Sequence, residues 1–314
     1  MDFVIAGVAA VCAGTITNPL DVIKLRLQMQ GELKAKGTHP VTYKNFIHTG
    51  YLIVKHEGVF SLQKGITAAA ALQLANNGLR LGTYQYAEGR GYMKDEKGNK
   101  VFIKQLMIGG LGGVLGQYFS SPLFLIKTHL QSKAAEAIAV GHQHEHTGLY
   151  RALVTIYSEH GIKGLFRGAV ASIPRAFVGS TSQLLAFDYA KLYLDQYDYF
   201  KDKYLLKSFL GSMAGGVAIS VMMTPFDLIL TRLYNQPVDE FGRGKMYSSY
   251  MDCVVKIYRT EGPRAFYKGI GPMYLRLGPH SVLCLVFWDL FKGAYEKYYL
   301  KSNAKMEPSQ TSLE

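Results

Sequence analysis

The stretch NPLDVIKLRLQ at residues 18–28 occurs three times in this chain in recognisable form. The second copy is SPLFLIKTHLQ at 121–131, and the third is TPFDLILTRLY at 224–234. Their prolines stand at positions 19, 122 and 225, and both 122 − 19 and 225 − 122 equal 103. A constant period over most of a chain indicates one structural unit used three times. We therefore predict three repeats, at 1–100, 101–203 and 204–300, and a polar, disordered tail at 301–314.

The composition limits the classes of protein to which the chain can belong. Of its 314 residues, 48% are hydrophobic and only 18% are charged, below the ~25% charged residues typical of soluble domains. The formal net charge of +12 suits nucleic acid, anionic lipid or a small anion as a partner. The three cysteines have no CxxC spacing, so we expect neither a zinc knuckle nor a disulfide framework. We expect no cleaved targeting segment, because Met-Asp-Phe leads straight into an apolar stretch.

Each proline stretch ends a run of residues without charge. The three runs, 3–20, 105–126 and 208–226, are about as long as the ~20 residues that cross a hydrocarbon core as a helix. They are rich in glycine, and pairs such as Gly112 and Gly116 suit the close packing of membrane helices. A dinucleotide-binding loop at 109–116 is the alternative, but Leu115 stands where its third glycine is required.

A second helix, less apolar than the first, is predicted in each repeat. A short amphipathic segment ends in an acid or histidine before glycine, and a base followed by glycine comes soon after, at 64–65, 167–168 and 268–269. The segments that follow, at about 66–90, 169–195 and 270–298, contain arginines and amides, as in helices with one face toward water or a pore. The sequence therefore predicts six membrane-spanning helices in three odd–even pairs.

These motifs resemble the signature of the mitochondrial carrier family (solute carrier family 25), P-x-[DE]-x-x-[KR] followed by [DE]-G-x-x-x-x-[aromatic]-[KR]-G. The match covers nearly the whole chain, with Phe124 and His160 replacing acids, Leu230 replacing a base and Gln63 replacing an aromatic residue. The resemblance implies an all-α membrane protein: a threefold pseudosymmetric barrel of six transmembrane helices with short matrix helices, in the mitochondrial inner membrane. The run of residues at 233–236 and 276–280 is most similar to the oxaloacetate-carrier branch.

The resemblance also implies how such a protein works. It implies a solute carrier rather than an enzyme, without a cofactor and with a solute path along the barrel axis. Its expected partners are a small anionic metabolite and inner-membrane lipid, including cardiolipin, rather than nucleic acid. The carrier is expected to be a monomer.

The resemblance further implies a matrix gate made of ion pairs between the odd helices. The acidic slots hold Asp21, Phe124 and Asp227, and the basic slots hold Lys24, Lys127 and Leu230. Pairing each acidic slot with the basic slot of the next repeat gives Asp21–Lys127, Asp227–Lys24 and the apolar Phe124–Leu230. The other two pairing schemes leave buried charges without partners, at a cost of about 3–5 kcal/mol each. The first scheme is therefore the predicted gate.

Two further sets of residues are expected at the gates. Four residues beyond the basic slots lie Gln28, Gln131 and Tyr234; the resemblance implies that the two glutamines brace the ion pairs, whereas Tyr234 suits a polar helix end equally well. The cytoplasmic gate resembles [FY]-[DE]-x-x-[RK], and its positions are occupied by Gln85, Glu88, Asp188, Lys191, Asp289 and Lys292. Either pairing direction brings two carboxylates together, so one of them should hold a proton when this gate is shut. The hypothesis is a weak, proton-sensitive gate at Glu88, with a solvated helix end as the alternative.

The resemblance also implies that the substrate contacts the second helix of each repeat about two turns, or seven residues, beyond the glycine of the base–glycine pair. This count gives Leu72, Arg175 and Arg276 at one depth, with Gln73 beside Leu72. Two guanidiniums without an acidic neighbour in the sequence are costly at mid-membrane, and they suit bidentate binding of a carboxylate. The alternative is that both pair with another group inside the barrel. Arg80, seven residues beyond Gln73, is predicted to be a further anion contact near the cytoplasmic mouth.

The residues beside the two arginines narrow the substrate class. Ala176 and Leu277 provide no carboxylate for an ammonium group, which disfavours amino acids. Arg175 stands where nucleotide carriers of the family usually have a small or aliphatic pair. The remaining class is a small dianion such as oxaloacetate or another dicarboxylate, with sulfate as a further candidate, moved by alternating access in exchange. A proton-coupled or uncoupling-type carrier is the alternative. A membrane scaffold and a soluble enzyme are disfavoured, because the arginines are retained and no catalytic motif appears.

Histidines alternate in the linker after the second proline stretch, at His142, His144 and His146, together with Glu145. Alternating histidines can bind a metal, but no second group of ligands lies nearby in the sequence. We therefore predict a solvated loop and no metal site.

Overall fold

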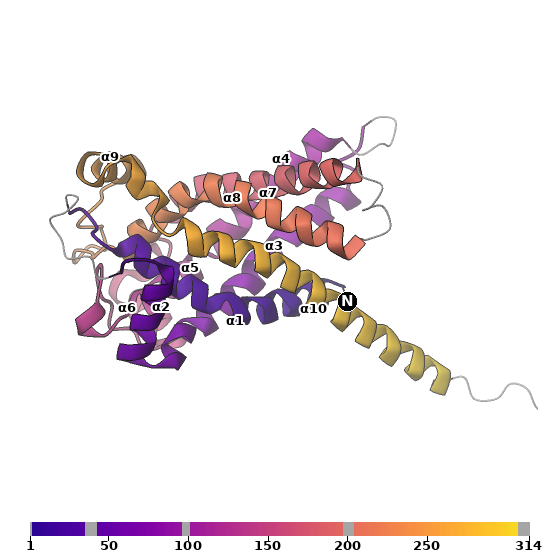
Figure 1. Ribbon diagram of the computed structural model, residues 1–314, viewed down its shortest axis with the longest axis horizontal. Helices are drawn as coiled ribbons and strands as arrows, with labels where there is room; N and C mark the ends of the chain where they lie inside the picture. Colours follow the sequence, from indigo (N-terminus) through magenta and orange to yellow (C-terminus); the bar gives the residue numbers. More distant parts are fainter. Residues whose placement is uncertain (1, 35–42, 96–100, 197–203, 307–314) are drawn as a thin grey trace, which may run out of the picture.

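The computed structural model describes residues 2–34, 43–95, 101–196 and 204–306, and within these ranges the regular elements are helices, without a strand longer than an isolated bridge (Figure 1). The long helices are α1 (Asp2–Met29), α3 (Ile66–Gly89), α4 (Phe102–Phe119) followed by α5 (Ser121–Ser132), α7 (Ser172–Asp195), α8 (Tyr204–Asn235) and α10 (Ile270–Met306). The shorter helices are α2 (Phe46–Glu57), α6 (Leu149–Leu165) and α9 (Tyr250–Glu261), with 3-10 turns η1 (Val59–Gln63), η2 (Glu136–Ile138) and η4 (Pro263–Tyr267).

The long helices contact one another in a closed cycle. α1 packs against α3, α3 against α4, α4 against α7, α7 against α8, α8 against α10, and α10 against α1. Figure 1 shows the short helices α2, α6 and α9 gathered at one end of the long helices. The order around the cycle is the order along the chain, so each helix is a neighbour in space of those next to it in sequence. Side chains from these helices line a cavity inside the cycle.

The proline stretches lie in the first long helix of each repeat, which we call the odd helix: α1, α4 with α5, and α8. The second long helix of each repeat, α3, α7 or α10, is its even helix. Pro19 lies inside α1 and Pro225 inside α8, where each ring removes one backbone N–H from the helical ladder. In the second repeat the helix is interrupted: α4 ends at Phe119, and Pro122 lies in the first turn of α5. Proline is tolerated there because a first-turn N–H has no partner within the helix.

The glycine of each base–glycine pair is required by its conformation and by close packing. Gly65, Gly168 and Gly269 have φ angles of 71°, 77° and 84°, which other residues adopt only with strain. A Cβ on Gly65 would lie 3.0 Å from Gln131, and one on Gly168 would lie 2.9 Å from the ring of Tyr234. The glycines therefore allow the start of each even helix to approach an odd helix of another repeat.

A carboxylate clamp ties the short helix to the odd helix in the first and third repeats. Arg26 donates to both oxygens of Glu57, at 2.6 and 2.9 Å, and Lys64 Nζ lies 2.5 Å from the same carboxylate. Burial raises the pKa of Glu57, but the hydrogen bonds from Arg26 and Lys64 outweigh it and lower the pKa to about 2. In the third repeat the clamp is Arg232, Glu261 and Lys268. The second repeat carries His129, His160 and Arg167 at these positions.

The C-terminal helix is longer than the sequence predicts. α10 continues to Met306, past residue 301 where the polar tail was expected to begin. The added residues include Ala304 and Lys305, which favour a helix, and no proline or glycine occurs between Lys301 and Met306. Residues 307–314 of the predicted tail lie outside the described residues.

Candidate substrate cavity and gate

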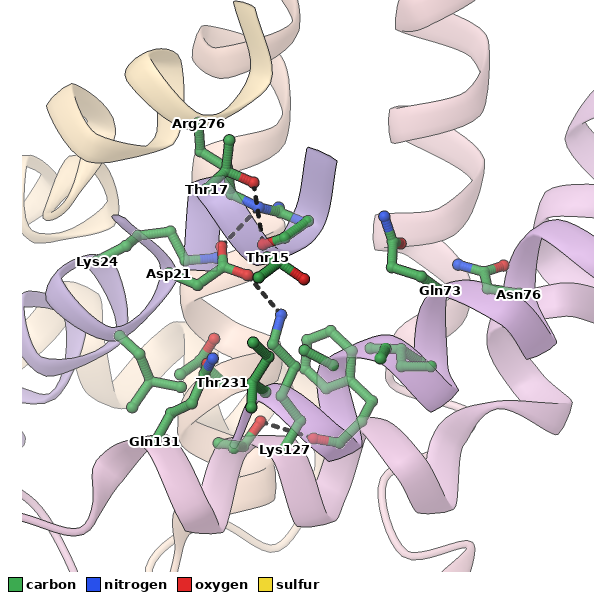
Figure 2. A pocket seen from close by; sticks show the side chains of 18 of the residues that line it. Thr15, Thr17, Asp21, Lys24, Gln73, Asn76, Lys127, Gln131, Thr231 and Arg276 are labelled. Carbon is green, nitrogen blue, oxygen red and sulfur yellow. Dashed lines mark hydrogen bonds and ion pairs between the residues drawn. The ribbon is translucent and has the colours of Figure 1, made fainter. Parts of the chain in front are cut away.

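A cavity inside the cycle of long helices is lined by residues of α1, α3, α5, α7, α8 and α10, and by Gln117 of α4. Figure 2 shows Asp21 between Lys127 and Arg276, with Gln73 and Asn76 on the other side of the space. Ionisable residues of membrane helices that face a cavity are usually functional, because their burial is otherwise costly. The cavity is therefore the candidate site for the solute.

Two buried ion pairs join odd helices at the end of the cavity near the proline stretches. Lys127 Nζ lies 2.6 Å from Asp21 Oδ2, and Lys24 Nζ lies 2.7 Å from Asp227 Oδ2. All four side chains are at most 11% exposed. Both predicted ion pairs are present in the structure. Removing one partner of such a pair costs about 3–5 kcal/mol, because it leaves a buried charge uncompensated.

Both candidate arginines contact the aspartates of these ion pairs. Arg276 Nε lies 2.6 Å from Asp21 Oδ1, while Arg175 Nε donates to Asp227 Oδ1 at 2.8 Å. Arg175 also donates through Nη1 to Gln117 Oε1 at 3.1 Å. The alternative reading of the sequence, in which both arginines pair with another group inside the barrel, therefore describes their contacts in the structure. Each carboxylate comes from an odd helix of another repeat, so the sequence next to the arginines gives no sign of it.

Each of the two aspartates contacts the lysine of the following repeat and the arginine of the preceding one. At the third place around the cycle, the apolar corner, the residues at the three equivalent positions are apolar. The equivalent trio is Phe124, Leu230 and Leu72, and all three lie in one buried hydrophobic cluster. Leu72 also lines the cavity but is only 6% exposed. The replacements of acid, base and arginine therefore belong together, because keeping any one of them charged would leave it without a partner.

The apolar corner formed by Phe124, Leu230 and Leu72 lies next to Arg175, which belongs to one of the charged trios. The guanidinium carbon of Arg175 lies 5.1 Å from the centre of the Phe124 ring, within the range of a cation–π interaction. The rings of Phe124 and Tyr234 are 5.3 Å apart. Phe124 therefore supports Arg175 from the position that an acid occupies in the other two repeats.

The three residues beyond the basic slots have different roles. Gln28 Nε2 donates to Asp227 Oδ2 at 3.0 Å, so it contacts the Lys24–Asp227 pair as expected. Gln131 donates instead to Asn18 Oδ1 at 3.0 Å, which corrects the expectation that it braces an ion pair. Tyr234 shares a hydrogen bond of 2.6 Å with Ser121 Oγ in the same way. Asn18 and Ser121 each precede a proline, so Gln131 and Tyr234 hold the proline stretch of the preceding repeat.

The opposite end of the cavity shows a different arrangement. Gln85 and Asp289 are exposed, and Lys292 Nζ lies 4.6 Å from the ring centre of Trp288 on its own helix. The side chains of Asp188 and Lys191 lie outside the described residues. Glu88 is partly buried at the end of α3. The cytoplasmic ion-pair ring therefore stays a prediction. At the other end, near the prolines, the Lys24–Asp227 and Lys127–Asp21 ion pairs are present.

Sequence reasoning missed several polar residues of the interior. His280 lies one turn beyond Arg276 on α10, with Nδ1 3.3 Å from Thr17 Oγ1 and Nε2 3.3 Å from Gln73 Nε2. These partners are 263 and 207 residues away in the chain, so no local pattern could indicate them. Arg80, predicted as a further anion contact, is not among the described residues that line the cavity.

Comparison with known proteins decides the family. A family model described as mitochondrial carrier protein matches residues 1–92, 98–198 and 201–299. The chain belongs to the mitochondrial carrier family. Members of this family are multi-pass inner-membrane transporters, so this carrier is a membrane transporter of the mitochondrion and not an enzyme. By length and apolar composition alone, two of its described helices are suited to span a membrane, Ile5–Met29 and Gly215–Asn235.

Named relatives cover almost the whole carrier. It is 47% identical to solute carrier family 25 member 35 of Mus musculus, across 95% of this chain and 99% of that protein. It is 40% identical to the mitochondrial oxaloacetate transport protein of Saccharomyces cerevisiae, across 91% and 87% of the two chains. It is 35% identical to mitochondrial citrate transporter E of Aspergillus niger, across 90% and 89%.

Proposed function

We propose that this carrier exchanges small dianionic carboxylates, oxaloacetate or a related dicarboxylate, across the inner membrane. The observation that carries the proposal is the pair of guanidiniums at the cavity wall, Arg175 and Arg276, each already holding a carboxylate. A planar guanidinium suits bidentate binding of a carboxylate. Two such groups in one cavity suit a substrate with two anionic groups. The names of two relatives, an oxaloacetate transport protein and a citrate transporter, support a small carboxylate as the substrate, and the first of them supports a dicarboxylate.

The contacts suggest how substrate binding would act on the matrix gate. A carboxylate of the substrate that binds Arg276 competes with Asp21, and one that binds Arg175 competes with Asp227. Each aspartate would then keep its lysine but lose its arginine. A ligand shifts a conformational equilibrium only by its difference in affinity between the states. Replacement of each aspartate by a substrate carboxylate on its arginine provides that difference in affinity, because it weakens the closed gate only when the substrate is present.

The finer architecture is part of the same proposal. The six long segments act as three odd–even pairs around a pseudothreefold axis, one pair in each of the repeats 1–100, 101–203 and 204–300. The Asp21–Lys127 and Asp227–Lys24 pairs form the matrix gate, and the ends of the even helices form the cytoplasmic gate, with Glu88 as its proton-sensitive member. The carrier works as a monomer surrounded by lipid that includes cardiolipin.

Uptake by liposomes that contain the purified carrier tests the substrate class. We expect saturable uptake of labelled oxaloacetate that depends on oxaloacetate or malate inside the vesicles. We expect at least ~10-fold slower uptake of aspartate and of ATP, because the carboxylate that lines the cavity, Asp21, is already paired with Lys127 and Arg276, and the two arginines suit a compact dianion. Uptake of sulfate without any carboxylate, or of ATP at an equal rate, would contradict the proposal.

A proton-coupled anion symporter is the second candidate, and His280 favours it. This histidine lies in the interior one turn beyond the arginine that we assign to the substrate, and an imidazole beside a bound carboxylate can take up a proton together with it. The same liposomes distinguish the two modes. Symport predicts oxaloacetate uptake driven by an inward proton gradient into vesicles without internal substrate, and exchange predicts none.

A further inference from the structure

The linker at 133–148 crosses the ends of α1 and α8 at the proline side of the carrier. Tyr43 donates its hydroxyl to the carbonyl of Ile138 at 2.6 Å, and Asn235 at the end of α8 donates to the carbonyl of His142 at 3.0 Å. A Cβ on Gly141 would lie 3.1 Å from Met29 at the end of α1. The linker is therefore an ordered strap rather than the solvated loop that the sequence predicts.

Three histidines meet where this strap passes α5. His129, on the last turn of α5, stacks on His144 with ring centres 3.5 Å apart, and His146 lies 5.4 Å from His129. One ring nitrogen from each of the three lies within 4.8 Å of the others. His129 lies on the helix before the linker, so no second group of ligands stands beside the alternating histidines in the sequence.

The hydrogen bonds of two of these rings fix their tautomers. His129 Nε2 lies 2.9 Å from the carbonyl oxygen of Tyr234, and His144 Nε2 lies 3.1 Å from that of Asn235. A carbonyl oxygen only accepts, so both Nε2 atoms carry the hydrogen and both Nδ1 atoms keep a free lone pair. The Nδ1 atom of His129 is buried and, within the described part of the chain, has no hydrogen-bond partner. Donation of the other ring N–H to a carbonyl is the usual support of a metal-binding histidine.

The histidines occupy the place of a missing clamp. In the first and third repeats, an arginine two positions beyond the basic slot binds the glutamate that ends the short helix. In the second repeat these two positions are His129 and His160, so a bidentate ion pair cannot form there. Arg167, the third member, donates to the carbonyl of Tyr234 at 3.3 Å instead. This repeat therefore needs another means of holding its connecting segment to the odd helix.

We propose that His129, His144 and His146 form a binding site for a divalent transition metal such as Zn²⁺, which fastens the strap at 133–148 to α5. Three neutral imidazoles suit zinc, copper and nickel, and a fourth position stays open to water.

Binding requires a small rearrangement of the three rings. Tetrahedral Zn–N bonds of about 2.0–2.1 Å place the nitrogens roughly 3.4 Å apart, so separations of up to 4.8 Å must shrink. The two stacked rings must also tilt so that their lone pairs converge. His144 and His146 lie on the linker, whose side chains are partly exposed there, so they can move toward the fixed Nδ1 of His129.

Metal binding would act on the end of the carrier where the ion pairs are formed. The strap already contacts α1 through Gly141 and α8 through Asn235, and a metal would add α5. If these helix ends separate during transport, as the proposed function requires, then a bound metal holds them together. Metal on the matrix side would thus slow exchange.

Titration calorimetry of the purified full-length carrier with Zn²⁺ and Ni²⁺ tests the site itself. We expect one ion per chain and a rise in Tm of at least ~3 °C at saturating Zn²⁺. His144→Gln and His146→Gln should each weaken binding at least ~10-fold. His142→Gln is the matched control, because this residue is exposed, lies in the same linker and is outside the three-histidine group. His146→Gln changes a partly exposed ring, so we expect this variant to fold, whereas a substitution of the buried His129 would disturb the core.

The outcomes separate the site from the transport proposal. No Zn²⁺ or Ni²⁺ binding, or equal affinities in wild type, His144→Gln and His146→Gln, would overturn the site. Binding that His146→Gln abolishes would support it even if no carboxylate is transported. In active liposomes, Zn²⁺ should slow exchange by wild type and His142→Gln but not by His146→Gln, and equal inhibition of all three would overturn the effect on the gate.

Discussion

Arg276→Ala and Arg175→Ala should each lower oxaloacetate exchange by at least ~100-fold in reconstituted liposomes. Each substitution removes one of the two guanidiniums that we assign to the substrate, and charge-assisted bidentate hydrogen bonds of this kind are the strongest that a side chain offers to a carboxylate. The change also leaves Asp21 or Asp227 with one cation fewer. Initial rates of labelled oxaloacetate uptake, normalised to the amount of inserted carrier, measure the effect.

Two further variants show whether geometry or charge alone is responsible. Arg276→Lys keeps the positive charge but loses the planar fork, so we expect a rate well below wild type and above Arg276→Ala. Arg259→Ala removes an exposed arginine from α9 and should leave exchange unchanged. Wild-type rates in Arg175→Ala or Arg276→Ala would remove both residues from the substrate site.

Asp227→Asn should be among the most destabilising single substitutions in the carrier. The carboxylate of Asp227 is fully buried and accepts hydrogen bonds from Lys24, Gln28 and Arg175. Without its charge, two buried cations lose their counter-ion, at a cost of about 3–5 kcal/mol. For a chain of this size we expect the Tm in detergent to fall by about 10 °C. Thermal unfolding of the purified protein measures the change, and Asp289→Asn is the control because that carboxylate is exposed.

The apolar corner provides a way to restore stability without charge. The triple variant Asp227→Phe, Lys24→Leu and Arg175→Leu reproduces the residues of the trio Phe124, Leu230 and Leu72. Replacing a buried ionic group as a whole by apolar side chains is often neutral or stabilising. We therefore expect the Tm to recover most of the loss while exchange stays abolished. A triple variant as unstable as Asp227→Asn would show that the ion pairs do more than neutralise one another.

Much of the gate could be predicted from the sequence, because its residues recur at a fixed period. The pairing of Asp21 with Lys127 and of Asp227 with Lys24 followed from the requirement that buried charges be compensated. Phe124 and Leu230 satisfied the same requirement by their lack of charge. The structure extends this reasoning to Leu72, which completes the apolar trio at the position of the arginines.

Other contacts could not be predicted, because they join residues of different repeats without a shared pattern. The carboxylates beside Arg175 and Arg276 come from helices at least 52 residues away. Gln131 occupies a position where a glutamine is expected to brace an ion pair, yet it donates to Asn18, a residue outside the signature. His129 stands where the first and third repeats have Arg26 and Arg232, and only the path of the linker brings His144 onto it. In each case the decisive information is which surfaces meet in three dimensions.

The affinity of Asp21→Asn for oxaloacetate tests whether the substrate and the gate aspartates compete for the same arginines. Asparagine is a weaker competitor than aspartate for Arg276, so we expect oxaloacetate to bind this variant at least ~3-fold more tightly than wild type, with the extra affinity lost in Asp21→Asn/Arg276→Ala. Ligand-induced shifts of Tm, titrated with oxaloacetate, give the affinities. An unchanged or weaker affinity in Asp21→Asn that folds normally would show that aspartate and substrate do not compete.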